Sequence, residues 1–279
     1  MKDVSVLFSQ KSVMAMVNNQ MPKVYRKLMK GCVTNEAINL DVLKKCYTYL
    51  EREYRNEYYF KNTIFNKLFL GVHSTKTTTV LNEVRIGNSR ADLIMLNGSP
   101  VVYEIKTGLD NFYKIDKQFS DYYSCFPYVV LVVDENNYYK AIRKRKNSKY
   151  PFGVYLMHNN SRIHKEYNPE AYDKQIENDC IYEIFRRKEI ETILKQQCGR
   201  IPDADDFTRY MRYRDCFRNI NINSKTYDQI WNILKERHSM RNDVIKKVPY
   251  ELKSLVYFMN LKEKDVDKLN WYLNQKVGC

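Results

Sequence analysis

Residues 90–106 read Arg-Ala-Asp-Leu-Ile-Met-Leu-Asn-Gly-Ser-Pro-Val-Val-Tyr-Glu-Ile-Lys and decide the fold that we predict for this chain. Two segments rich in apolar residues flank the turn Asn97-Gly98-Ser99, a pattern that is typical of a β-hairpin. Side chains two apart on a strand share a face. Glu104 and Lys106 are therefore expected to point the same way, away from the layer that receives Tyr103.

The register of this hairpin decides whether Asp92 joins Glu104. The two carboxylates are directly opposed only if strand pairing is centred on Gly98, whereas a two-residue Asn97-Gly98 turn would separate them onto different faces. We therefore predict a three-residue loop, residues 97–99, or a bulge that restores the same parity. A simpler interpretation stays open, in which the hairpin charges form a solvated salt bridge.

The residue types at this hairpin indicate phosphodiester chemistry. Carboxylate oxygens are hard ligands that hold divalent cations, and such an ion both neutralises a phosphate and activates water. Without an ion, two close carboxylates repel each other by roughly 1 kcal/mol at 4 Å in water, so one of them protonates more readily. Asp92, Glu104 and Lys106 are thus candidate catalytic residues of a metal-dependent nuclease.

The flanking segments predict an α/β core with a mixed sheet. Residues 81–87 predict a strand before the hairpin, and the apolar run 128–133 predicts a strand buried on both faces. Between the hairpin and that last strand, residues 109–125 carry apolar side chains at intervals of three and four, which indicates an amphipathic helix. This order of strands and helix is typical of an α/β protein.

Three more polar residues are candidates for the site. Gln118 and Tyr122 lie four apart on that helix and so on one side of it, although they also fit surface polarity beside a core aromatic residue. Upstream, apolar spacing over residues 50–68 predicts a helix that ends before Gly71. Glu57 lies on or beside its buried stripe, where a carboxylate needs a partner or a metal. It is either a third acidic group of the site or an interfacial salt-bridge residue.

With these residues in place, the chain resembles the PD-(D/E)XK, or restriction-endonuclease-like, nuclease superfamily. Asp92 matches the first carboxylate of the motif and residues 104–106 match its (D/E)-x-K element. Glu57 matches the acidic residue often found on the helix before the sheet. Residues 118–122 match the Gln-x-x-x-Tyr helix motif of RecB-like exonucleases.

The resemblance covers about residues 51–135, and residues 85–92 also look like a small bacterial branch of restriction-like proteins. One departure is Ala91, which replaces the proline of the motif. The resemblance implies that Asp92, Glu104 and the backbone carbonyl of Ile105 hold Mg²⁺ or Mn²⁺. Lys106 would orient or help to deprotonate the attacking water and stabilise the charge on the phosphorus centre. The Gln-x-x-x-Tyr pair would fix the substrate strand or the position of the lysine.

The organisation expected from these patterns is an α/β fold, with a mixed central sheet flanked by helices in a restriction-endonuclease-like core, followed by a helical C-terminal region. We place the boundaries at residues 1–50 for an N-terminal helical segment, 51–168 for the nuclease core and 169–279 for the helical C-terminal region. No chemical motif is found in that last region.

Basic residues outnumber acidic residues by 47 to 33 in the 279-residue chain, and the net charge of +14 favours a polyanionic partner. The segment Lys140–Lys149 carries six positive charges. One interpretation is a patch that follows phosphates; the other is a solvated basic helix end. The residues that we expect to contact nucleic acid are Arg90, Arg143, Lys144, Arg145 and Lys146.

Seven cysteines with no Cys-x-x-Cys spacing and an odd total fit reduced cytosolic thiols rather than a disulfide framework. No apolar run reaches the roughly 18 to 20 residues that a bilayer span needs, and the first apolar segment is too short for a secretion signal. We therefore expect a cytoplasmic protein without a membrane partner.

The leading expectation is a Mg²⁺- or Mn²⁺-dependent deoxyribonuclease that acts in bacterial or phage restriction, defence or DNA processing. RNA stays open as a substrate. The alternative is a catalytically silent nucleic-acid-binding subunit of a larger complex, whose hairpin charges serve structure. Association with a second copy or with a partner protein also stays open.

Overall fold

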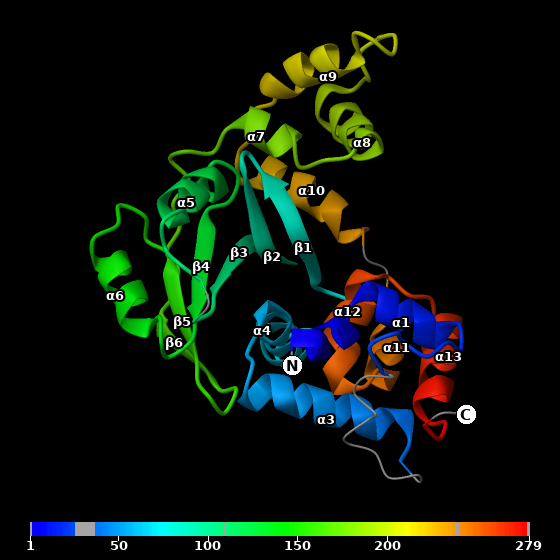
Figure 1. Cartoon of the computed structure of the whole chain (residues 1–279). Coiled ribbons are helices and arrows are strands. Elements are labelled where there is room, and N and C mark those ends of the chain that lie inside the picture. Colours follow the sequence, from blue (N-terminus) through cyan, green and yellow to red (C-terminus); the bar gives the residue numbers. More distant parts are fainter. Residues whose placement is uncertain (1, 26–36, 109, 238–239, 278–279) are drawn as a thin grey trace. The chain divides into compact units, whose positions relative to one another are not determined.

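The computed structural model describes residues 2–25, 37–108, 110–237 and 240–277. The chain forms two compact units, and each is described here by itself (Figure 1). Unit 1 comprises residues 1–77, 159–162 and 238–279, and unit 2 comprises residues 78–158 and 163–237. The predicted hairpin therefore belongs to unit 2.

The described part of unit 1 is helical. Its elements are η1 (Lys2–Phe8), α1 (Gln10–Val17), α3 (Asn39–Arg52), α4 (Glu57–Ile64), η2 (Phe65–Leu70), α11 (Asn242–Lys247), η3 (Tyr250–Leu252), α12 (Lys253–Phe258) and α13 (Glu263–Leu273). Buried aromatic rings join segments distant in sequence, as where Phe65 lies 4.9 Å from Tyr257 between ring centroids. The contact packs η2 against α12.

The helix predicted over residues 50–68 is divided in the structure. α3 ends at Arg52, and a new helix begins at Glu57, because the Asn56 side chain accepts a hydrogen bond from the backbone N–H of Tyr59 and caps it. The predicted end before Gly71 is confirmed, since η2 ends at Leu70.

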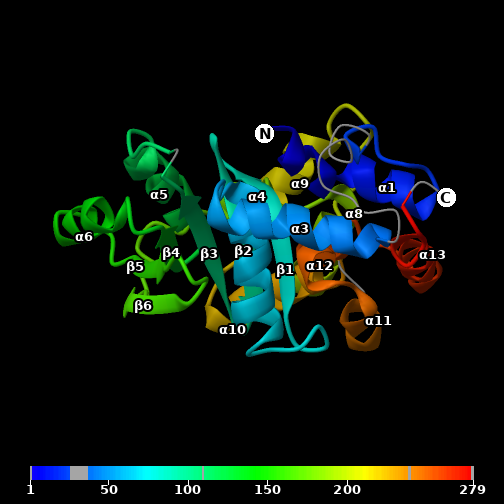
Figure 2. The same cartoon turned by 60° about the horizontal axis from the view of Figure 1, so that its bottom comes forward.

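Unit 2 contains a six-stranded sheet in the order β1-β2-β3-β4-β5-β6 (Figure 2). The strands are β1 (Thr79–Ile86), β2 (Ser89–Asn97), β3 (Ser99–Lys106), β4 (Tyr128–Val133), β5 (Gly153–Met157) and β6 (Ile163–Tyr167). The pairs β3–β4 and β4–β5 are parallel and the other three are antiparallel. Five of the six residues of β4 are buried, as predicted for its continuous apolar run.

Helices of unit 2 cover the sheet and extend beyond it. They are α5 (Ile115–Tyr123), α6 (Tyr138–Lys146), α7 (Asn178–Tyr182), α8 (Arg187–Cys198), α9 (Arg209–Arg218) and α10 (Ser224–Lys235). One apolar core joins β2, β3 and β4 to α5 and to α7–α10, and Phe119 and Trp231 are among its largest fully buried side chains. The α/β fold class, the mixed sheet and the helical C-terminal region are thus confirmed.

The predicted boundaries at residues 50 and 168 divide the chain in sequence order, whereas unit 1 combines segments from both ends of the chain and unit 2 takes most of the sequence between them. That division stays a prediction. Among the described residues, no helix combines the length and the apolar character that crossing a bilayer requires.

Candidate functional site

The hairpin has the register on which the site depends. Cα pairing between β2 and β3 runs from Asn97↔Ser99 to Leu93↔Tyr103 and is therefore centred on Gly98, as predicted. Gly98 itself has a left-handed φ of 66°. The same register, continued by one residue, sets Asp92 opposite Glu104, so both carboxylates belong to the face of the sheet that α5 covers.

The carboxylate of Glu104 is the centre of a polar cluster under α5. Its Oε1 atom accepts hydrogen bonds from Lys106 Nζ and from Gln118 Nε2, both at 2.6 Å. Its Oε2 atom accepts a hydrogen bond from the Tyr122 hydroxyl, also at 2.6 Å. Four of the six predicted catalytic residues therefore meet at one carboxylate, and they come from β3 and from one turn of α5.

Burial makes these contacts strong. Glu104 is only 2% exposed, and a buried carboxylate is costly unless donors compensate it. Burial raises the pKa of the Tyr122 phenol well above its usual value, and the negative charge of Glu104 raises it further. The phenol therefore stays protonated and donates to the carboxylate. Gln118 Oε1 is buried and has no hydrogen-bond partner among the described residues.

Asp92 sits where β3 separates from β2. Its Oδ2 atom accepts a hydrogen bond of 2.7 Å from the backbone N–H of Ile105, the residue after Glu104. The side chain thereby takes the place of the next ladder bond beyond Leu93↔Tyr103. The backbone on which Glu104 and Ile105 stand is thus tied directly to the first predicted carboxylate.

A second acidic residue near Asp92 was missed by the sequence analysis. Pairing between β1 and β2 continues to Ile86↔Ser89 across a two-residue turn. The pairs Asn82↔Leu93 and Val84↔Ala91 on either side place Glu83, whose φ is a left-handed 52°, across from Asp92. Carboxylate oxygens of the two residues lie within 4.8 Å of each other. The turn at Gly87-Asn88 was the available signal, since it fixes which residue of β1 faces Asp92.

The carboxyl ends of β3 and β4 form a hydrogen-bonded edge beside Lys106. Asp134, which follows β4 and is 7% exposed, accepts hydrogen bonds from the backbone N–H groups of Gly108 at 2.6 Å and Asn137 at 3.0 Å. The Asn137 side chain in turn donates to the carbonyl oxygen of Thr107 at 2.5 Å. The start of α6 is therefore fixed to the end of the strand that carries Glu104 and Lys106.

Two further predicted site residues are Glu57, in unit 1, and Arg90, in unit 2. Glu57 is the first residue of α4 in unit 1, is exposed, and forms an ion pair with Lys61. We expected Glu57 on or beside a buried stripe with a partner; its side chain is 57% exposed, and Lys61 is the partner. The role of Glu57 as a third acidic group stays a prediction. The Arg90 side chain is 66% exposed with Nη1 3.7 Å from Glu83 Oε2, and its carbonyl oxygen lies 2.9 Å from the Tyr122 hydroxyl oxygen.

The helix predicted over residues 109–125 is shorter in the structure. α5 begins at Ile115 and ends at Tyr123. Before it, the Asp110 carboxylate accepts hydrogen bonds from the Thr107 N–H and hydroxyl groups and forms a turn instead of a helix. Residue 109, where the prediction began, lies outside the described residues.

The fold and this cluster define an α/β protein whose mixed sheet carries a buried Glu104, hydrogen-bonded to the partly buried Lys106, near the carboxyl end of β3. A family model described as Bacteriophage P4 protein cII matches residues 51–263, more than half of the chain. The chain therefore belongs to this family. No curated protein and no solved structure matches it.

Proposed function

We propose that this protein is a divalent-metal-dependent nuclease that hydrolyses DNA phosphodiester bonds. The observation that carries the proposal is that Lys106, Gln118 and Tyr122 all donate hydrogen bonds to the carboxylate of Glu104. Asp92 accepts a hydrogen bond from the backbone N–H of Ile105, the next residue. This is the residue set of the PD-(D/E)XK resemblance, drawn from three separate parts of the sequence. A role in phage or bacterial restriction, defence or DNA processing belongs to the same proposal.

The donor set fits Mg²⁺ or Mn²⁺. Asp92 and Glu104 supply hard carboxylate oxygens, and the backbone carbonyl of Ile105 is the third proposed ligand. A carboxylate has about four acceptor positions, and Glu104 uses three of them. When bound, such an ion would neutralise phosphate charge and lower the pKa of a coordinated water.

The side chains around Glu104 have separate proposed roles. Lys106 supplies a positive charge next to the carboxylate, where it can stabilise charge that develops on the phosphate. Gln118 and Tyr122 position Glu104 and are not themselves assigned to the substrate. Because each donates to a different carboxylate oxygen, the two together fix the rotation of the carboxylate plane.

The test is cleavage of circular single-stranded DNA, circular duplex DNA and RNA in Mg²⁺ or Mn²⁺. We expect EDTA to stop cleavage and Lys106→Ala to abolish it without unfolding the chain. Asp92→Asn is a second variant, because its amide oxygen can still accept the Ile105 N–H. Lys188→Ala, at an exposed position on α8, is the matched control and should cut like the wild type. Full activity of Lys106→Ala, or no cleavage under any condition, would refute the proposal.

A second function is favoured by one specific observation. Glu104 is almost completely buried and is compensated by three donors, so the cluster can serve structure alone. The protein would then be a catalytically silent nucleic-acid-binding subunit of a larger complex. Nucleic-acid binding without EDTA-sensitive cutting, together with a loss of stability in Lys106→Ala, is the result expected for this alternative.

A further inference from the structure

The fold divides the basic residues of α6 into two sets. Lys144 and Arg145 are turned toward neighbouring elements and are neutralised there. Lys144 Nζ lies 2.5 Å from Asp116 Oδ2 on α5, and Arg145 Nη2 lies 3.2 Å from Glu170 Oε1. The Arg145 guanidinium also lies over the rings of Phe152 and Tyr167, at 5.9 and 5.7 Å. These two cations stabilise the fold and are poorly placed for a ligand.

The remaining cations of α6 face solvent. Lys140, Arg143 and Lys146 are all exposed. In the described part of the chain, Arg143 and Lys146 form no ion pair, and the Lys140 ammonium donates only to Asn137 Oδ1 at 3.3 Å. Residues 139, 143 and 146 repeat at intervals of four and three, so they lie on one side of the helix. We call Tyr139, Lys140, Arg143 and Lys146 the outward face of α6.

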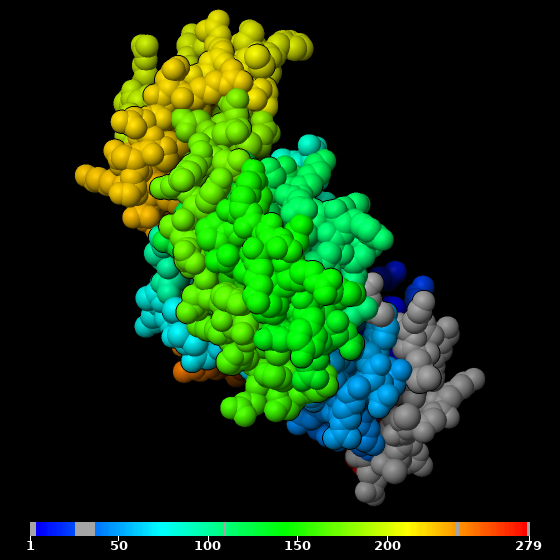
Figure 3. Space-filling model, turned by 90° about the vertical axis from the view of Figure 1, so that its left-hand side faces the viewer, coloured from blue at the N-terminus to red at the C-terminus, as the bar shows by residue number. Residues whose placement is uncertain are grey.

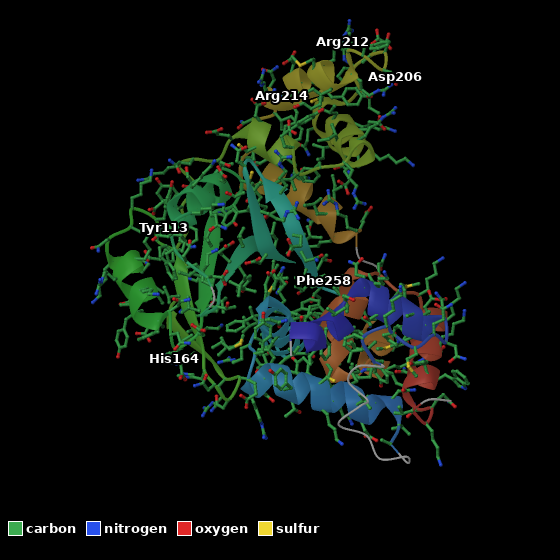
Figure 4. The ribbon with its side chains drawn as sticks, viewed as in Figure 1. Tyr113, His164, Asp206, Arg212, Arg214 and Phe258 are labelled. Atoms are coloured by element: carbon green, nitrogen blue, oxygen red, sulfur yellow. The ribbon has the colours of Figure 1, made fainter. Side chains whose placement is uncertain are left out.

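Aromatic rings accompany these charges. Tyr139 is 79% exposed and Tyr113 is 92% exposed. Tyr113 lies on the loop before α5, where Figure 4 labels it. Single exposed apolar groups are common on proteins and need no explanation by themselves. Here, however, the exposed ring of Tyr139, in edge contact only with its neighbour Tyr138 among the described rings, lies about one turn from two cations that have no charged partner among the described residues. Planar rings beside positive charge are the elements that bind unpaired nucleic-acid strands.

The outward face begins at the candidate site. The bonds Gly108 N–H to Asp134 and Asn137 to the Thr107 carbonyl hold the start of α6 against the end of β3. Tyr139 and Lys140 stand in the first turn of α6 after this junction, and its partners Thr107 and Gly108 directly follow Lys106 in the chain. From residue 140 to residue 146 the helix advances roughly 9 Å. α6, drawn in green, reaches the surface seen in Figure 3.

We infer that the outward face of α6 binds single-stranded nucleic acid, with Lys140, Arg143 and Lys146 on phosphates and Tyr139 stacked on a base. The strand would be led along the helix toward Lys106. This last step rests on the proposed nuclease function, whereas the binding itself does not. Ion-paired Lys144 and Arg145 take no part, which separates this inference from a general attraction by the basic segment.

The experiment measures binding of a fluorescent single-stranded DNA oligonucleotide by polarisation, using the full chain in EDTA so that cleavage plays no part. The test variant is Lys140→Ser/Arg143→Ser/Lys146→Ser. The matched control is Lys188→Ser/Lys195→Ser/Arg200→Ser, which removes the same charges from exposed positions on and after α8. Matching RNA and duplex DNA arms identify the kind of strand.

We expect the α6 variant to lose about tenfold or more in affinity at low salt. The negative slope of log affinity against log salt should become less steep by about 2. The control should change far less. Tyr139→Ala should weaken single-strand binding roughly fivefold or more, while Tyr139→Phe, which keeps the ring, should bind like the wild type.

Three results would overturn the inference. The first is an equal loss of affinity in the two triple variants. The second is a salt dependence of the α6 variant that matches the wild type. The third is wild-type affinity of Tyr139→Ala for single strands, together with tighter binding of duplex than of single strands by the wild type. Tight binding through the outward face by a protein that cuts nothing would refute the nuclease proposal and leave this inference standing. If Lys106→Ala abolishes cutting while the α6 variant cuts and binds like the wild type, the nuclease proposal stands and this inference is refuted.

Discussion

The hydroxyl of Tyr122 lies 2.6 Å from Oε2 of Glu104, and both side chains are almost completely buried. The contact links α5 to the end of β3 across the core of unit 2. A hydrogen bond to a charged acceptor is among the stronger ones in proteins, and here the acceptor cannot turn to water instead. The position of α5 and the orientation of the carboxylate are therefore coupled.

Tyr122→Phe should lower the free energy of unfolding by about 1.5–3 kcal/mol, because Glu104 loses a donor and stays buried. The neighbouring residue offers a matched control. Tyr123 is equally buried, and its hydroxyl has no hydrogen-bond partner in the part of the chain that the structure describes. Tyr123→Phe should be neutral or stabilising. Urea unfolding measures both, and equal losses would contradict the contact described for Tyr122.

Gly98→Ala should destabilise the hairpin by about 1–2 kcal/mol. The cause is conformation alone, since Gly98 has a φ of 66° and a Cβ atom there would meet nothing within 4 Å. Gly98→Asn should cost less, because asparagine tolerates the left-handed region better than alanine. Thermal unfolding of the two variants checks the ranking. A larger loss for Gly98→Asn would indicate a crowded turn instead.

Stability should fall at acid pH partly through Glu189. Burial raises the pKa of this carboxyl, but hydrogen bonds from Arg237 and from the Arg186 N–H outweigh it, so the pKa lies below the usual 4.5. A depressed folded-state pKa stabilises the protein above about pH 4.5, and this contribution is lost as the pH falls through the folded value. Unfolding between pH 3 and 7 should show a smaller acid loss in Glu189→Gln than in the wild type. The control Glu236→Gln, at an exposed carboxylate, should keep the full loss.

Cys198 and Cys216 should form a disulfide when an oxidant such as diamide is added. The two Sγ atoms lie 3.5 Å apart, on the last residue of α8 and within α9. Two thiols would lose two protons and two electrons to the oxidant, lowering the mass by about 2 Da. Closing this loop should stabilise the chain by about 3 kcal/mol.

Burial and the neighbouring Cys216 raise the pKa of the Cys198 thiol to about 11, so oxidation should be slow at neutral pH and faster at alkaline pH. Peptide mass mapping identifies the bond, and Cys198→Ser should abolish it. If both thiols remain free after diamide treatment, α8 and α9 do not approach closely enough for the bond.

The local pattern of the sequence determined much of unit 2. Strand spacing, the glycine at position 98 and the polarity of alternate residues are enough to predict the hairpin register, and with it the face that Asp92 and Glu104 share. These signals are local because a strand repeats every two residues and its turn sets the pairing. The apolar run 128–133 likewise predicts a buried strand. The same reasoning merged two helices over residues 50–68 and made the helix over residues 109–125 too long, because the Asn56 cap and the turn made by Asp110 interrupt an apolar spacing that continues past them.

Only the tertiary structure decided how polar groups distant in sequence are paired. It joined Gln118 and Tyr122 to Glu104, set Glu83 beside Asp92, and brought Cys198 to Cys216 without any spacing motif. It also neutralised Lys144 and Arg145 while leaving Arg143 and Lys146 in solvent. The physical reason is that burial and partner choice depend on which elements pack together, and a side chain's own neighbours in the sequence do not contain that information.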